Sequence, residues 1–144
     1  MGGTAYDKDV IAWSLEQAKL LRSGRFDALD IEHLAEEIED VGKSEQRELE
    51  SRMAVLIAHL LKWQFQPERR GSSWERTIKD QRDSIKRRLN KTPSLSRSLK
   101  DDDWWRDAWL DARILAEKET GLTEFPDDCP WTAGQILNLE FFPT

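Results

Sequence analysis

The stretch from His59 to Arg82 gathers a histidine, two tryptophans, three glutamines and four arginines where two predicted helices meet. His59 lies at the edge of an apolar helical stripe, one turn before Trp63. Buried polar groups need hydrogen-bond partners, so such a set can fix the register of two helices without any catalysis. It could instead line a small-ligand pocket, or let His59 act as a general acid–base. This candidate binding cluster consists of His59, Trp63, Trp74, Thr77, Gln81 and Arg82.

A second histidine, His33, follows Asp30 at a spacing that can bring a carboxylate and an imidazole to one metal ion. Di-iron helical bundles need two Glu-x-x-His pairs and further inward glutamates, whereas this chain has one such pair at most. On a helical wheel, His33 points opposite Ile31 and Leu34, so we expect it to face water. The sequence therefore predicts no metal site and no cofactor.

Other catalytic patterns are absent from the sequence, which has no glycine-rich phosphate loop, no G-x-S-x-G and no H-E-x-x-H. The single cysteine, Cys129, follows Asp127 and Asp128, whose negative charge should raise its thiol pKa and make it a poor nucleophile. We predict no catalytic residue, and the sequence favours a non-enzymatic protein.

Charge is segregated along the chain. The net charge is −6 over residues 1–61, +8 over residues 62–100 and −8 over residues 101–144. The basic middle can form solvated faces paired with the acidic helices, or a surface for a protein partner. It can also form a strip for phosphates with Trp63 or Trp74 stacking on bases, although a total charge of −6 repels nucleic acid. The candidate basic patch consists of Arg69, Arg70, Lys79, Lys86, Arg87, Arg88 and Lys91.

The elements that must position these residues are helices. Apolar residues at spacings of three and four, with capping residues at the ends, predict helices over residues 7–24, 31–63, 72–90 and 92–121. The second could be one long bent helix or two joined ones. Asp7, a Ser72–Glu75 capping box and Thr92 should begin three of them, and Gly121 should end the last. The expected inward residues of the first two helices include Val10, Ile11, Leu15, Ala18, Leu21, Ile31, Leu34, Ala35, Ile38 and Val41.

We therefore predict an all-α fold, a bundle of about four main helices with a packed irregular C-terminal tail. A chain of 144 residues fits a single helical domain over residues 1–144. The lone cysteine and the lack of a secretion signal favour the cytoplasm. The longest apolar stretch, residues 53–61, is too short to span a bilayer, so we expect no membrane association.

Several short blocks, taken in order, make the chain similar to the bacterial family named domain of unknown function 29. The blocks are Leu34-Ala35-Glu36-Glu37-Ile38-Glu39, His59-Leu60-Leu61-Lys62-Trp63 with Gln66-Pro67, Ser73-Trp74 with Thr77-Ile78 and Gln81-Arg82, Pro93-Ser94-Leu95, Glu119-Thr120-Gly121-Leu122, and Phe125-Pro126 with Cys129-Pro130. The resemblance runs from about residue 30 to the carboxyl end. It implies a small, almost wholly α-helical protein, and it brings no substrate, cofactor or catalytic residue.

The functional prediction is a small cytoplasmic, non-enzymatic protein that binds a protein partner or itself through a charged helical face. The first alternative is a nucleic-acid-associated factor that uses the basic helix of residues 74–91. The second is a small-ligand binder or enzyme around His59.

Overall fold

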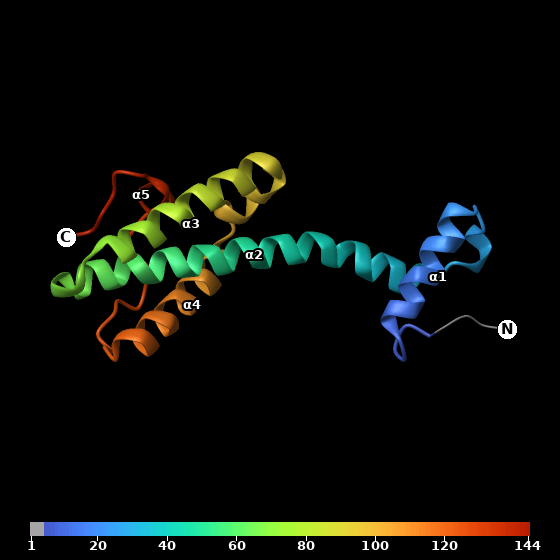
Figure 1. Ribbon diagram of the computed structural model, residues 1–144, viewed down its shortest axis with the longest axis horizontal. Coiled ribbons are helices and arrows are strands. Elements are labelled where there is room, and N and C mark those ends of the chain that lie inside the picture. The colour runs from blue at the N-terminus through green and yellow to red at the C-terminus, as the bar shows by residue number, and fades with distance from the viewer. Residues whose placement is uncertain (1–4) are drawn as a thin grey trace. The chain divides into compact units, whose positions relative to one another are not determined.

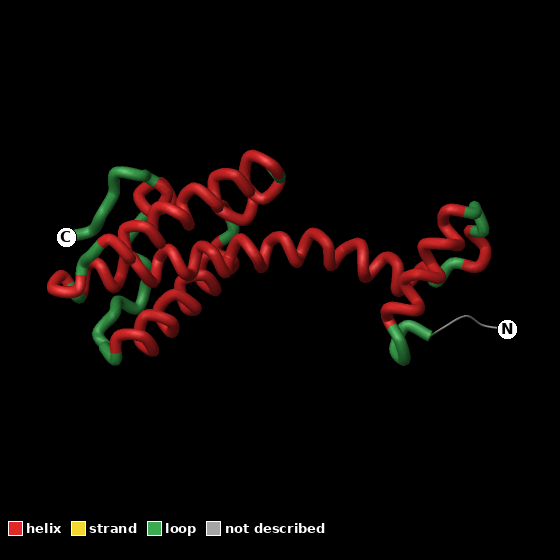
Figure 2. The backbone as a smooth tube through the Cα atoms, viewed as in Figure 1, coloured by secondary structure: helices red, strands yellow, loops and turns green. Residues whose placement is uncertain are grey.

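The computed structural model describes residues 5–144, and over this range the chain is helical with no strand. The elements are α1 (Val10–Arg22), η1 (Phe26–Ala28), α2 (Ile31–Phe65), η2 (Pro67–Arg69), α3 (Ser72–Lys91), η3 (Pro93–Lys100), α4 (Asp102–Thr120) and α5 (Ala133–Leu137) (Figure 2). This confirms the all-α class with four main helices and an irregular tail. Of the two alternatives for the second helix, the structure has the single long one. Within residues 5–144, no helix is long and apolar enough to cross a membrane.

The chain divides after Ser44 into two compact units, and helix α2 contributes residues to both. We call residues 5–44 the amino-terminal unit and residues 45–144 the carboxyl-terminal unit. Each is described by itself below. The prediction of a single domain over residues 1–144 stays a prediction.

The carboxyl-terminal unit is built on the second half of α2, with α3 and α4 packed along it (Figure 1). Fully buried apolar residues from these helices form its core; they include Leu49, Met53, Leu56, Ile57, Leu60, Leu61, Ile78 and Ile85. Helix α4 contributes Ala108, Ala112 and Ala116, all completely buried, at a spacing of four residues. Such a ridge of small side chains allows a neighbouring helix to approach closely.

Three of the predicted helix starts differ from the structure. Helix α1 is capped by Asp9, whose carboxylate accepts a hydrogen bond from the Ala12 amide at 3.0 Å, and not by Asp7, which lies in the preceding turn. The Ser72–Glu75 capping box is wrong because Ser72 is already the first helical residue, after the extended Gly71. The third difference is the start of the last long helix, which was predicted at Thr92.

Thr92 begins the 3₁₀ segment η3 and not the last long helix. The long helix α4 begins nine residues later, because Asp101 caps it and accepts hydrogen bonds from the amides of Asp103 and Trp104 at 2.9 and 3.4 Å. Its end is as predicted, since Gly121 adopts the left-handed conformation (φ 76°) that a helix C-terminus favours.

The tail after Gly121 packs on the carboxyl-terminal unit, as predicted. Phe125 and Ile136 are buried in its core, and Trp109 Nε1 donates a hydrogen bond to the Asp127 carbonyl at 2.8 Å. Helix α5 begins with a capping box between Thr132 and Gln135. The tail is therefore held by specific contacts although it is mostly irregular.

The amino-terminal unit consists of α1, η1 and the start of α2, and it buries little. Among residues 5–44 the buried ones are Trp13 and Gln17, and both bind Asp30 at the start of α2. Trp13 Nε1 donates to the Asp30 carboxylate at 2.9 Å, and Gln17 Oε1 accepts from the Asp30 amide at 2.8 Å. Hydrogen bonds to Asp30 thus form part of the contact between the two helices.

Most of the apolar residues predicted to face inward in this unit are exposed, which corrects the prediction. Ile11 and Ile38 are each 71% exposed, and Val41 is 68% exposed. The physical reason is that two helices can cover only the faces that they turn toward each other. Here those faces carry Trp13, Gln17 and Asp30, so the apolar stripes lie outside the contact.

Candidate functional site

The predicted histidine, His59, lies half-buried on α2 with its Nδ1 2.9 Å from the Val55 carbonyl oxygen. A carbonyl accepts and does not donate, so Nδ1 carries the proton and Nε2 holds a lone pair in the neutral ring. Desolvation lowers the pKa of His59, and the charge of Lys62 lowers it further, against a raising effect of the Val55 bond. Burial of His59 therefore favours its neutral form.

Each of the two predicted tryptophans of this cluster has a cation against its ring. The Arg70 guanidinium carbon lies 5.3 Å from the Trp63 ring centroid, and Arg70 Nε donates to the Trp63 carbonyl at 2.6 Å. Lys62 Nζ lies 5.9 Å from the Trp74 ring centroid and also forms an ion pair with Glu119 of α4. Both tryptophan rings thus form cation–π contacts within the carboxyl-terminal unit.

Arg82 is the most buried member of the cluster, with 2% of its surface exposed. Its Nε donates to the Ile136 carbonyl and its Nη2 to the Phe141 carbonyl, both at 2.7 Å, and its guanidinium carbon lies 5.4 Å from the Phe142 ring centroid. Burial lowers the pKa of Arg82, yet a guanidinium stays charged at any physiological pH. Arg82 therefore fastens the tail to α3.

The remaining two members form no hydrogen bond with the rest of the cluster. Thr77 Oγ1 donates to the Ser73 carbonyl at 3.2 Å, and Gln81 Oε1 is buried without a hydrogen-bond partner. Trp63 and Arg82 meet through Phe142, which packs 5.0 Å from the Trp63 ring. A hollow of about 340 Å³ beside Phe142 is lined by Glu75, Lys79, Arg82, Leu139 and Phe142. Of the six residues of the predicted cluster, Arg82 is the one that lines this hollow. A ligand pocket shared by all six residues stays a prediction.

The predicted basic patch is spread over η2 and α3. Arg69, Lys79, Lys86, Arg87 and Lys91 are exposed, and Arg70 lies on Trp63. Arg88 is paired with the α2 carboxylates of Glu45 at 3.5 Å and Glu48 at 3.4 Å. Part of the patch thus serves the packing of α3 on α2.

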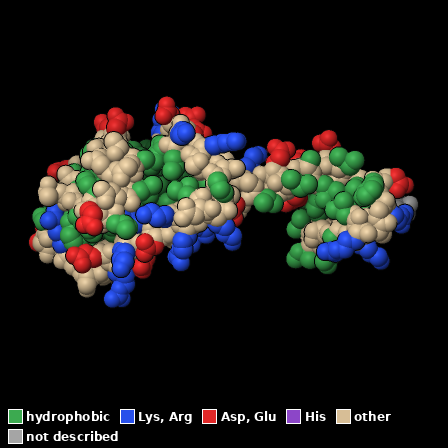
Figure 3. All heavy atoms as spheres, turned by 90° about the horizontal axis from the view of Figure 1, so that it is seen from above, with side chains coloured by type: hydrophobic (Ala, Val, Ile, Leu, Met, Phe, Trp, Pro, Cys, Tyr) green, Lys and Arg blue, Asp and Glu red, His purple; other side chains and the backbone are tan. Residues whose placement is uncertain are grey.

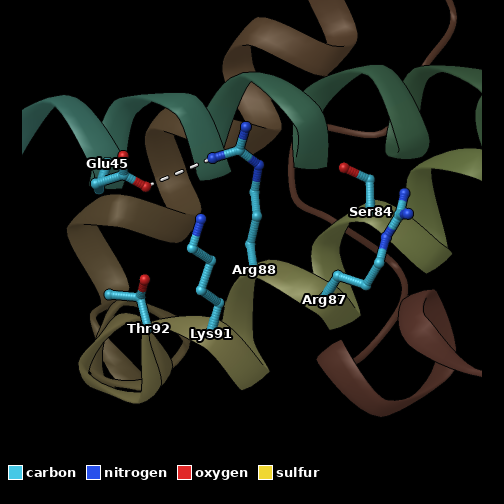
Figure 4. A pocket seen from close by; sticks show the side chains of 6 residues that line it. All are labelled: Glu45, Ser84, Arg87, Arg88, Lys91 and Thr92. Atoms are coloured by element: carbon cyan, nitrogen blue, oxygen red, sulfur yellow. Dashed lines mark hydrogen bonds and ion pairs between the residues drawn. The ribbon is translucent and has the colours of Figure 1, made fainter.

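A hollow of about 400 Å³ lies where the end of α3 meets α2, and Figure 4 shows the side chains that line it. These are Glu45, Ser84, Arg87, Arg88, Lys91 and Thr92. Lys91 and Arg88 extend toward α2, and Arg87 lies beside Ser84 (Figure 4). Two hydroxyls and three cations can bind a phosphate, although Glu45 and its pairing with Arg88 reduce the positive charge.

The thiol of Cys129 is half-buried and lies 3.5 Å from the Trp131 carbonyl oxygen, to which it donates. Its pKa is raised, as the sequence indicated, but the main cause is burial and not the neighbouring aspartates. A thiol in this state is a poor nucleophile.

The feature that sequence reasoning missed is a set of exposed apolar residues on the amino-terminal unit. We call it the amino-terminal apolar surface; its residues are Val10, Ile11, Leu15, Leu21, Phe26, Ile31, Ile38 and Val41, each 47–71% exposed. Figure 3 shows hydrophobic side chains gathered on this unit. In the 100 residues of the carboxyl-terminal unit, the exposed large apolar residues are Ile114 (59%), Leu139 (48%) and Leu110 (37%).

Helices α1 and α2 contribute to one side of this surface together. A groove of about 340 Å³ runs between them and is lined by Val10, Ile11, Trp13, Ser14, Gln17, Ala18, Leu21, Leu34 and Glu37. The sequence contained one signal for this surface, because the apolar residues of α1 cover more of the helix circumference than a single neighbouring helix can bury.

A family model described as "Domain of unknown function DUF29" matches residues 5–142, nearly the whole chain. No curated protein and no solved structure matches the chain.

Proposed function

The chain belongs to the family described as Domain of unknown function DUF29, and we propose that it acts as a small, non-enzymatic protein-interaction module. The observation that carries this proposal is the amino-terminal apolar surface. Sequence reasoning pointed to a charged helical face, whereas the surface that supports the proposal is apolar with charges at its edges. A reducing cytoplasm suits the single free thiol of Cys129, and we propose that location.

The size of this surface supports a protein ligand. The eight side chains leave on the order of 900 Å² open to water, taking roughly 180 Å² for a fully exposed residue. The largest apolar patch of a typical monomer is about 300–600 Å². A stable protein–protein interface buries about 800 Å² on each partner, so the surface is large enough to form one.

The proposal is tested with Ile38→Arg, which places a charge in the middle of the α2 part of the surface. Ile114→Arg on α4 is the matched control, because Ile114 is also an exposed isoleucine (59%) but lies outside the surface. Cross-linking and capture from lysate should recover the same bound proteins with the wild type and with Ile114→Arg. Ile38→Arg should no longer recover them. Equal contacts for all three proteins would refute the proposal.

A second candidate, nucleic-acid association, is favoured by the basic hollow at the end of α3, where Arg87 and Lys91 are exposed beside two hydroxyls. A labelled oligonucleotide should then bind at about 50 mM salt and dissociate steeply as salt rises. The double variant Arg87→Gln with Lys91→Gln should weaken binding, and Lys8→Gln should not. No binding of the wild type at low salt would remove this candidate.

A further inference from the structure

We propose that the amino-terminal apolar surface binds a second copy of this chain, in a two-fold dimer that packs α1 of one copy on α2 of the other. This inference rests on the proposed function and names the partner. It is carried by three observations: the antiparallel order of the two helices, the position of their apolar faces, and the opposite charge of the two edges.

The contacts within the unit show that α1 and the start of α2 run antiparallel. Tyr6 donates its hydroxyl to Glu37 and stacks on His33 with ring centroids 4.2 Å apart, whereas Trp13 bonds to the earlier residue Asp30. Tyr6, in the turn just before α1, thus contacts later residues of the second helix than Trp13 within α1 does, which is the order of an antiparallel pair. The unit is a helical hairpin.

Both apolar faces lie on the same side of this hairpin. In α1 the exposed Val10, Ile11 and Leu21 flank the buried Trp13 and Gln17, and in α2 the exposed Ile31 and Ile38 flank the half-buried Leu34. Leu34 lines one groove with Val10 and Leu21 of α1. Ile31 and Ile38 lie three residues before and four residues after Leu34, so they stand on the same face of α2 beside this groove. A hairpin with one apolar side is half of a four-helix arrangement, and a second identical hairpin supplies the other half.

The two edges of the surface carry opposite charge. On α1, Lys19 and Arg22 follow Leu15 by four and seven residues, so they border its outer edge. On α2, Glu32 and Glu39 are seven residues apart and border the opposite edge. All four side chains are exposed, and one further cation, Lys43, lies a turn beyond Glu39 on α2.

This charge pattern selects between the two ways in which identical hairpins can face each other. With the two-fold axis along the helices, α1 lies over α2 of the partner copy, and each basic edge meets an acidic edge. With the axis across the helices, α1 lies over α1, and like charges meet at both edges. Opposite charges favour the first arrangement and like charges disfavour the second.

The area of the surface also suits a second copy. Its α1 residues and the Ile31 and Ile38 side of α2 expose roughly 670 Å², taking roughly 180 Å² for a fully exposed residue. With the charged edges this approaches the about 800 Å² buried per partner in stable complexes. An isologous contact uses the same residues twice, so one apolar surface suffices for both copies.

The experiment is sedimentation equilibrium of the full chain between about 1 and 100 μM. The wild type and the control Ile114→Arg should sediment as a dimer of the 16.8 kDa chain, and Ile38→Arg and Ile11→Arg as monomers, a loss of affinity of at least a hundredfold. Circular dichroism checks that the variants keep their helices, as expected for side chains 71% exposed. A dimer that survives both substitutions would overturn the proposal.

Charge reversal tests the arrangement. Glu32→Lys with Glu39→Lys makes both edges basic, so it should weaken the dimer at least about tenfold. Mixing it with Lys19→Glu plus Arg22→Glu, whose edges are both acidic, should restore a mixed dimer. In the other arrangement like edges already meet, so the first double variant would dimerise as the wild type does, and that result would overturn the proposed packing.

The outcomes separate this inference from the proposed function. A wild type that stays monomeric at 100 μM while Ile38→Arg alone loses its captured proteins would overturn self-association and leave the interaction role. A monomer whose captured proteins are unchanged by Ile38→Arg would overturn both.

Discussion

Replacing Arg82 by methionine should release the tail from α3. Methionine retains the unbranched, apolar stem of the side chain but removes both donors, so the Ile136 and Phe141 carbonyls lose their 2.7 Å hydrogen bonds. The guanidinium also leaves the face of the Phe142 ring. The packing around residue 82 is largely kept, because the buried stem of methionine is similar in volume to that of arginine.

The expected loss follows from these contacts. A hydrogen bond from a charged donor contributes about 1.5–3 kcal/mol to stability, and there are two. Burying the guanidinium costs part of that gain, and the half-buried Phe141 can regain water at its carbonyl, whereas the fully buried Ile136 cannot. We therefore expect Arg82→Met to lower the free energy of unfolding by about 2–3 kcal/mol.

Urea unfolding measures this loss, and limited proteolysis locates it. Cleavage should begin between residues 122 and 144 in Arg82→Met, while α2 to α4 stay protected. Arg82→Lys is the matched variant, since an ammonium keeps the charge but lacks the planar fork that reaches both carbonyls, so it should lie between wild type and methionine. If Arg82→Met unfolds within about 0.5 kcal/mol of wild type and its tail resists protease equally, the tail is held by its apolar contacts alone.

Two further predictions concern the carboxyl-terminal unit. Burial, followed by the hydrogen bond and charge of Asp111 and the charge of Asp107, raises the pKa of Glu50 to about 7, so the folded state binds a proton that the unfolded state releases above about pH 4.5. The stability that this carboxyl group contributes is thus present below pH 4.5 and lost as the pH rises to about 7. After allowance for solvent screening, we expect Glu50→Gln to be more stable than wild type by about 1 kcal/mol in urea unfolding at pH 8. At pH 4 the two proteins should be equally stable. An equal difference at both pH values would contradict this account. Gly121→Ala should lower the midpoint of urea unfolding by the equivalent of about 1 kcal/mol, because φ is 76° there, whereas Gly71→Ala, at an extended residue with open space around it, should lose less.

Helix positions could be read from the sequence to a large extent because helix signals are local. The stop at Gly121 depends on residues within a few turns, and it was predicted correctly. Capping residues were harder to assign, since Asp7 and Asp9 are equally good caps by type and only the chain conformation decides between them.

The exposed surface and the role of Arg82 could not be read from the sequence. Ile38 and Leu49 occupy equivalent positions in amphipathic patterns on one helix, yet Ile38 is largely exposed and Leu49 fully buried. The pattern marks a face that will be covered and does not say by which chain. The sequence suggested Arg82 as a ligand-binding residue. Its role in holding the tail could not be seen, because the carbonyls that accept its hydrogen bonds lie 54 and 59 residues further along the chain and no sequence motif links them.

The same separation along the chain affects how the protein is made. Ile136 and Phe141 leave the ribosome 54 and 59 residues after Arg82, which at about 5–20 residues per second is a delay of roughly 3–12 s. During that delay the Arg82 guanidinium lacks the Ile136 and Phe141 carbonyls as hydrogen-bond acceptors. Burying the unpaired charge would cost several kcal/mol. Until the tail arrives, the guanidinium therefore stays hydrated on the side of α3 that the tail later covers, so this side of the carboxyl-terminal unit is completed late in synthesis.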